Sequence, residues 1–96
     1  MSWEGVWRLG ETVRLTAYFA DAAGPVVGGA AKIWVYAPDG TLVVNNQAMS
    51  EWANGHYYYD YIGSAQIGIY SASVAIVAND LYGGGSFEVQ NVGVMV

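Results

Sequence analysis

The chain has 96 residues, a length that fits one domain and leaves no room for a second hydrophobic core. Hydrophobic residues make up 54% of the sequence and charged residues only 11%, so the charges are too few to cover a small monomer, and some apolar surface must be exposed or covered by a partner. The net charge of −5 comes from scattered acids against three bases, Arg8, Arg14 and Lys32, which excludes the clustered basic residues that nucleic-acid binding requires.

The sequence has no cysteine, which excludes disulfides and thiolate chemistry. Residues 1–5 have neither the basic nor the apolar region of a secretory signal. No apolar stretch approaches the roughly 20 residues of a membrane span. We therefore expect a chain that is made in the cytoplasm and has no membrane partner.

Alternation of apolar and polar residues with a period of two predicts strands along most of the chain. In the segment 31–36, for example, Ile33 and Val35 fall on one face and Trp34 and Tyr36 on the other. The segments predicted as strands are 12–19, 31–36, 41–44, 56–61, 70–77 and 86–90, while 45–47 and 49–52 are interpreted as a loop or a short strand.

Turn signals separate these segments. In 37–40, Pro38 presets φ and Gly40 tolerates the left-handed conformation. Asn54-Gly55 is a second tight-turn signal, and 79–85, with its run of glycines, is expected to be a hairpin loop. About seven short strands at intervals of about 8–12 residues predict an all-β sandwich, with a small barrel as the structural alternative.

Several short motifs occur in a recurring order along the chain. They are Gly10-Glu11-Thr12-Val13-Arg14-Leu15, Gly24-Pro25-Val26, Val35-Tyr36-Ala37-Pro38-Asp39-Gly40-Thr41, Gly55-His56-Tyr57-Tyr58-Tyr59, Gly68-Ile69-Tyr70 and Gly85-Ser86-Phe87-Glu88-Val89. This order resembles the immunoglobulin-like β-sandwich modules of bacterial, archaeal and phage surface and virion proteins, including macroglobulin-type domains. The resemblance spans roughly residues 9–89.

The resemblance implies an immunoglobulin-like sandwich of about seven antiparallel strands. It also implies that the Tyr70 hydroxyl bonds back to the backbone across a corner and that Tyr57 packs between the sheets. The chain then divides into an N-terminal arm over 1–9, the sandwich domain over 10–90 and an apolar tail over 91–96. Modules of this kind serve as spacers, adhesion units and virion components, so the resemblance defines fold better than function.

Groups that could support catalysis are sparse. The single histidine, His56, shares a strand face with Asp60, but alternation places the two about 13 Å apart, too far for a direct pair. An enzyme would need a pocket that gathers His56 with Asp60 or Glu51. A calcium site formed by Asp39, Asp60 or Asp80 is not favoured, because no loop of the sequence carries a dense run of acidic residues. We therefore expect no cofactor, no metal and no enzymatic activity.

Aromatic residues are the stronger candidates for function. By alternation Trp34, Tyr36 and Tyr58 point outward, where they could anchor a protein interface or stack on sugar rings. The alternative is that Trp34 is simply the core tryptophan of the sandwich. The outer face of 69–77 has no charge, which favours a subunit contact over a cover by the chain's own loops.

The ends of the chain are also apolar. Trp3 and Trp7 lie in the arm, and Val94, Met95 and Val96 lie in the tail. The tail either docks on the sheet edge of a neighbour or extends the last strand of its own sheet. The predicted interface residues are therefore Trp3, Trp7, Trp34, Tyr36, Tyr58, Val94, Met95 and Val96, and the predicted structural residues are Tyr57, Tyr70, Pro38 and Gly40.

Two functions are compatible with these features. The first is a non-enzymatic assembly protein, such as a capsid-decoration or tail subunit located in a virion, whose partners are copies of itself or a shell or tail protein. The alternative is a carbohydrate- or cell-surface-binding module of a larger secreted protein, whose partners are glycans and whose location is extracellular.

Overall fold

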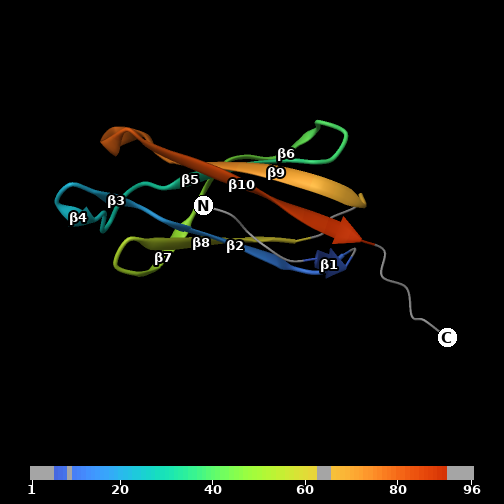
Figure 1. The fold of residues 1–96 in the computed structure, drawn as a ribbon, viewed down its shortest axis with the longest axis horizontal. Helices are drawn as coiled ribbons and strands as arrows, with labels where there is room; N and C mark the ends of the chain where they lie inside the picture. The colour runs from blue at the N-terminus through green and yellow to red at the C-terminus, as the bar shows by residue number, and fades with distance from the viewer. Residues whose placement is uncertain (1–5, 9, 63–65, 91–96) are drawn as a thin grey trace.

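The computed structural model describes residues 6–8, 10–62 and 66–90 of the chain. Its strands form a five-stranded sheet in the order β1-β10-β9-β5-β6, a three-stranded sheet in the order β2-β8-β7 and a small β3-β4 hairpin. The two larger sheets lie face to face, and the hairpin extends from one end of the sandwich (Figure 1). The all-β sandwich predicted from alternation is therefore confirmed. The elements are β1 (Val6–Arg8), β2 (Val13–Tyr18), β3 (Ala20–Asp21), β4 (Gly24–Pro25), β5 (Lys32–Tyr36), β6 (Leu42–Ala48), β7 (Ser50–Ala53), β8 (His56–Tyr61), β9 (Gly68–Ile76), the short 3₁₀ helix η1 (Val77–Asn79) and β10 (Leu81–Gln90).

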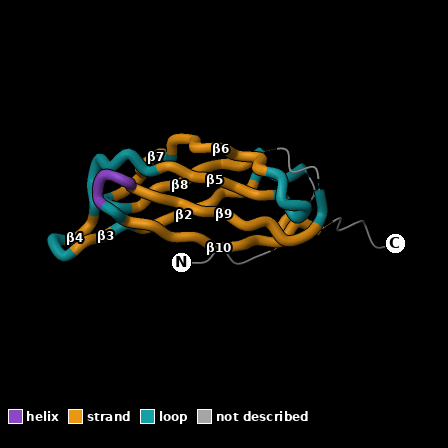
Figure 2. Tube along the Cα trace, turned by 90° about the horizontal axis from the view of Figure 1, so that it is seen from above, coloured by secondary structure: helices purple, strands orange, loops and turns teal. Residues whose placement is uncertain are grey.

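The core lies between the two sheets and is built by alternation along each strand. From β2, Val13 and Leu15 are fully buried, and from β5, Ile33 and Val35 are fully buried. Seen from above, β5, β9 and β10 cross over β8 and β2 and cover this core (Figure 2). Burying these side chains supplies most of the favourable free energy of folding, because each one contributes about 1.5–3 kcal/mol.

The Tyr57 side chain connects the two sheets through its ring and its hydroxyl. It is 1% exposed, and its ring packs edge-on against Phe19 at a centroid distance of 5.8 Å. The hydroxyl donates to the Val26 carbonyl at 2.7 Å and accepts from the Gly29 amide at 2.9 Å. Residues 26–29 lie between β4 and β5, where the chain passes into the five-stranded sheet, so this side chain fixes the crossing.

Tyr70 forms a second internal anchor, at the other end of the core. Its hydroxyl donates to the Gln66 carbonyl at 2.8 Å, four residues upstream, and accepts from the Gln66 amide at 3.2 Å. Its ring stacks on Phe87 with a centroid distance of 5.0 Å and an interplanar angle of 9°. The side chain therefore closes the loop before β9 in the manner of a tyrosine corner.

The turn over 37–40 joins β5 to β6. Gly40 has a φ of +89°, and its amide donates to the Ala37 carbonyl at 2.9 Å. The Asp39 carboxylate accepts from the Thr41 amide at 2.9 Å. Pro38 lies so close to Gly68 that a Cβ added to that glycine would be 2.9 Å from the proline ring, so the turn packs against the start of β9.

The prediction of a glycine-rich hairpin loop over 79–85 is wrong. Residues 83–85 lie inside β10 and pair with Val74, Ser73 and Ala72 of β9, while the turn is made by η1 and by Asp80, whose φ is +55°. Glycine lets β10 approach β9 closely here, because a Cβ on Gly84 would be 2.8 Å from the Ala72 carbonyl oxygen. Glycine permits this approach because it has no side chain to displace the neighbouring strand.

The segments interpreted as a loop or a short strand, 45–47 and 49–52, belong to two strands of different sheets. Strand β6 pairs with β5 and strand β7 pairs with β8, and Met49 between them donates its amide to the Ala31 carbonyl at 2.9 Å. Both pairings contain a register shift. Bulges of this kind break the alternation that a sequence pattern relies on.

Strand β1 places the end of the predicted N-terminal arm inside the fold. It pairs in parallel with β10, with Trp7 opposite Val89. Trp7 is half-buried and packs against the core, and its indole Nε1 is buried without a hydrogen-bond partner. Residue 7 is therefore a sheet residue, whereas the remainder of the arm, apart from 6 and 8, lies outside the described residues.

We expect Tyr57→Phe to lower the free energy of unfolding by about 1–3 kcal/mol, because it leaves the Val26 carbonyl and the Gly29 amide without their buried partner. Urea denaturation measures this change. Tyr82→Phe is the matched control, because Tyr82 is 66% exposed and its change should stay within about 0.5 kcal/mol. Equal losses in the two variants would show that the bridging hydroxyl has no such role.

Candidate interaction surfaces

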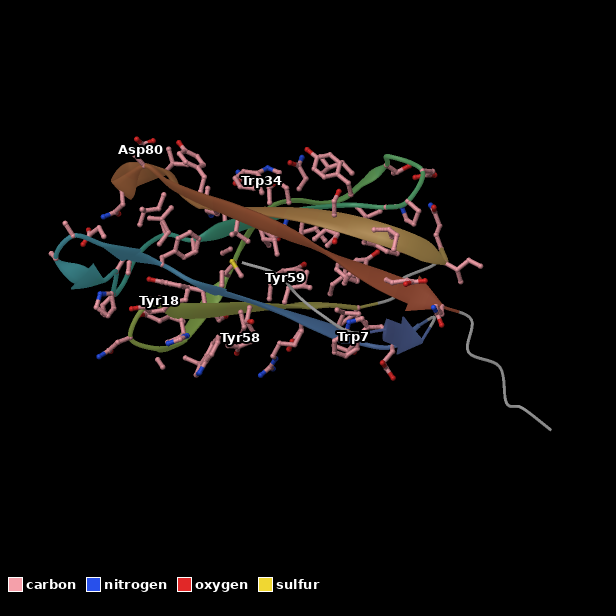
Figure 3. All side chains as sticks on the ribbon, in the orientation of Figure 1. Trp7, Tyr18, Trp34, Tyr58, Tyr59 and Asp80 are labelled. Atoms are coloured by element: carbon pink, nitrogen blue, oxygen red, sulfur yellow. The ribbon has the colours of Figure 1, made fainter. Side chains whose placement is uncertain are left out.

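The predicted aromatic contact residues lie on two opposite faces of the sandwich. Trp34 points away from the core on the outer side of the five-stranded sheet, Tyr58 lies on the outer side of the three-stranded sheet, and Tyr59 lies between them (Figure 3). Trp34 is half-buried and is not the core tryptophan. The structure thus brings Trp34 together with Tyr36, and it does not bring either of them together with Tyr58.

The first surface is the outer face of the five-stranded sheet, which we call the five-strand face. Residues 32, 34 and 36 of β5 are paired across it with Ala75, Ser73 and Ser71 of β9, which are paired in turn with Tyr82, Gly84 and Ser86 of β10. Its members are Lys32, Trp34, Tyr36, Leu42, Ile69, Ser71, Ser73, Ala75, Tyr82, Gly84, Ser86 and Glu88.

Exposed apolar side chains surround a centre of small residues on this face. Tyr36 is 38% exposed, Leu42 39%, Ile69 57% and Tyr82 66%. Among the members named above, Lys32 and Glu88 carry the charges, and they lie at opposite ends of the paired rows. The centre therefore has no charge that would oppose the burial of this face against another molecule.

The second surface is an aromatic strip on the outer face of the three-stranded sheet, formed by Tyr18, Trp52, His56 and Tyr58 with Arg14 and Asp60. The His56 ring lies between the other two rings of its row, at centroid distances of 4.6 Å from Tyr18 and 5.3 Å from Trp52. Trp52 also contacts Tyr58 at 5.9 Å. Tyr18 is 48% and Trp52 53% exposed, so large ring surfaces are available to a ligand.

One ion pair completes the strip. The Arg14 guanidinium donates to both oxygens of the Asp60 carboxylate, from Nε at 2.8 Å and from a terminal nitrogen at 2.9 Å, and its Cζ lies 4.3 Å from the Tyr58 ring centroid. The hydrogen bond from Arg14 holds the pKa of Asp60 below its ordinary value. Because both side chains are partly exposed, at 58% and 32%, the pair orients the strip more than it stabilises the fold.

A β-bulge determines that Trp52 belongs to this strip. Strand β7 pairs Ala53 with His56 and then Glu51 with Tyr57, so one residue is inserted between these pairs. In regular pairing after the Asn54-Gly55 turn, Trp52 would oppose the buried Tyr57 and face inward. The extra residue reverses its direction, which is why sequence alternation missed Trp52.

The Glu51 carboxylate anchors the bulge. One oxygen accepts from the Gly28 amide at 2.9 Å and the other from the Gly55 amide at 3.2 Å. These contacts tie β7 both to the turn that precedes β8 and to the crossing loop fixed by Tyr57. The Glu51 carboxylate is therefore occupied by backbone donors.

The described residues assemble neither a catalytic set nor a metal centre. His56 packs between two aromatic rings, Asp60 is paired with Arg14, and Glu51 binds backbone amides. Within the described ranges there is no group of three or more His, Cys, Asp or Glu residues that could hold a metal ion, and no pocket is enclosed. In the same part of the chain, no helix is long and apolar enough to cross a membrane.

The other predicted contact residues are placed only in part. Trp7 packs against the core, as described above. Trp3, Val94, Met95 and Val96 lie outside the described residues, so their predicted contacts stay predictions.

No protein-family model and no curated protein matches the chain. Among solved structures, the crystal structure of the Lin-41 filamin domain is similar, with a TM-score of 0.65 and 14% identity over 90% of this chain and 83% of that one. Likeness at this identity concerns the fold alone. Together with the two-sheet topology it defines the chain as an immunoglobulin-like β-sandwich, without singling out the macroglobulin-type modules of bacterial and phage proteins.

The Arg14–Asp60 pair makes stability depend on pH. The folded-state pKa of Asp60 lies below its unfolded value of about 3.9, so the stabilisation is present above that value and is lost as the pH falls through the folded-state pKa. We expect Asp60→Asn to be less stable than the natural chain at pH 7, with a difference that shrinks as the pH falls below about 3.9, as urea denaturation at each pH will measure. Asp80→Asn, which removes a carboxylate and keeps the ion pair, is the control. A pH-independent difference for Asp60→Asn would contradict the assignment.

Proposed function

We propose that this chain is a non-enzymatic interaction module that binds protein subunits through the five-strand face. The observation that carries the proposal is the composition of that face: aromatic and aliphatic side chains, among them Tyr36, Leu42 and Ile69, around an uncharged centre of serine and glycine. Protein interfaces concentrate aromatic residues and exclude charge from their centre in the same way.

Flatness of the centre supports a protein partner further. Ser71 and Ser73 of β9 are paired with Ser86 and Gly84 of β10. Because all four residues are small, little projects above the sheet at this point. Another flat surface, such as a second sheet, can approach such a centre closely and pack against the rings beside it. Burial of apolar area there would stabilise the complex by about 25 cal/mol per Å² before the cost of association is subtracted.

The narrower role is assembly of a particle. We place this chain among subunits of the capsid-decoration or tail type, located in a virion, on the grounds of its low charge, its apolar termini and its resemblance to virion modules. The likeness to a filamin domain supports the immunoglobulin-like fold of such a subunit and is neutral on the virion itself.

A single charge at the centre of the five-strand face tests this function. Ser71→Lys places a cation between Tyr36 and Ser86, where burial would leave it without a partner, and should therefore abolish association. Ser50→Lys puts the same side chain on the outer face of the other sheet and should leave association unchanged. Light scattering over a concentration series measures self-association of the three chains.

The same chains, immobilised, then identify partners other than a second copy. Proteins from the source extract that are retained by the natural chain and by Ser50→Lys, and lost with Ser71→Lys, are the partners of the five-strand face. If Ser71→Lys alters neither self-association nor any retained protein, the five-strand face is not the interface and the proposal fails.

A further inference from the structure

The structure also points to a second binding site: we infer that the aromatic strip binds a neutral oligosaccharide, a chain of linked pyranose rings. The strip lies on the three-stranded sheet and the five-strand face on the other, so the two sites occupy opposite sides of the sandwich (Figure 3). The inference therefore stands independently of the proposed protein contact.

The composition of the strip suits a sugar. The outward residues of β2, β7 and β8 are Arg14, Thr16, Tyr18, Ser50, Trp52, Ala53, His56, Tyr58 and Asp60, and all but Ala53 have a ring, a hydrogen-bonding group or both. Ala53 is the small aliphatic member of this set, whereas the five-strand face carries the larger Leu42 and Ile69. A sugar presents apolar C–H faces and polar hydroxyls together, so it needs rings for stacking with donors and acceptors beside them.

The charge of the strip suits a neutral ligand. Arg14 and Asp60 neutralise each other through two hydrogen bonds. With His56 neutral, the strip as a whole therefore has no net charge. An anionic or cationic ligand would therefore find no uncompensated charge to bind. Arg14 and Asp60 retain exposed polar atoms, with side chains 58% and 32% exposed, and these can still bond sugar hydroxyls.

The row of rings in the strip has the dimensions of a short sugar chain. Tyr18, His56 and Trp52 form a row across three neighbouring strands, about 10 Å from end to end at the usual strand spacing. That length suits a disaccharide or trisaccharide unit. No pocket is enclosed by the described residues, so the strip accommodates a stretch of an extended chain. Neighbouring rings are tilted by 37° and 40°, which matches a twisted soluble chain better than the flat surface of a crystalline polysaccharide.

The side chains of the strip are preorganised by contacts with one another. Each ring of the strip already contacts its neighbour, and the Arg14 guanidinium is held over Tyr58 while its nitrogens bond Asp60. The side chains therefore lose little conformational freedom when a ligand binds. The Glu51 anchor of the bulge keeps Trp52 outward and so belongs to the positioning of this site.

Calorimetric titration of the full chain with maltohexaose, cellohexaose, mannohexaose and xylohexaose tests the inference. We expect saturable binding of at least one of these neutral chains, with a change in tryptophan fluorescence. Trp52→Ala should weaken the binding by about tenfold or more, whereas Trp52→Phe, which keeps a ring, should restore much of it. Tyr82→Ala, an exposed aromatic residue on the opposite face, should leave the binding unchanged.

Backbone amide NMR shifts locate the ligand and check that the variants fold. Shifts confined to β2, β7 and β8 support the site. Absence of binding to all four chains, equal loss in Trp52→Ala and Tyr82→Ala, preference for a charged oligogalacturonate, or a protein bound at the strip in place of sugar would each overturn the inference. Ser71→Lys should bind the sugar normally, so that failure here leaves the protein contact of the five-strand face untouched.

Discussion

The Tyr57 hydroxyl is the constraint on which the arrangement of the two sheets depends. It joins the Val26 carbonyl and the Gly29 amide to the centre of the three-stranded sheet, at the point where the chain crosses into the other layer. Glycine at position 29 leaves room for this contact, because an added Cβ would be 2.8 Å from the Ile76 Cδ1 atom and 3.2 Å from the Tyr57 hydroxyl. The crossing loop is thus pinned between one polar contact and one tightly packed core residue.

The outward direction of the aromatic strip follows from that crossing. With the loop held in place, the Gly28 amide is available to the Glu51 carboxylate, which also accepts from Gly55 and fixes the bulge in β7. The bulge turns Trp52 out of the core and beside His56. The Tyr57 hydroxyl positions the loop, the loop positions the Glu51 carboxylate, and this carboxylate fixes the residue inserted in β7. Together these contacts determine which side chains form the aromatic strip.

Sequence patterns predicted the parts of the fold that follow regular alternation. They oriented Ile33 inward and Trp34 outward, and they predicted the turn at Gly40. They failed where contacts between residues distant in sequence determine the structure. Gly84 of β10 allows a close approach to Ala72, and the outward direction of Trp52 depends on a bulge that is anchored to another loop. Neither contact leaves a periodic signal. Opposite placement of Trp34 and Tyr58 likewise required the strand order, which alternation within single strands does not contain.

The low charge of the chain has different consequences on the two faces of the sandwich. Aliphatic groups such as Leu42 and Ile69 gain from complete removal of water, which only an extensive protein contact provides. The strip on the other sheet joins rings to polar groups and an internal ion pair, and such groups tolerate a contact that stays partly hydrated. Because the sandwich holds the two faces on opposite sides, occupation of one leaves the other open. A module with this division can attach to a subunit lattice by one sheet and present the other to the surroundings.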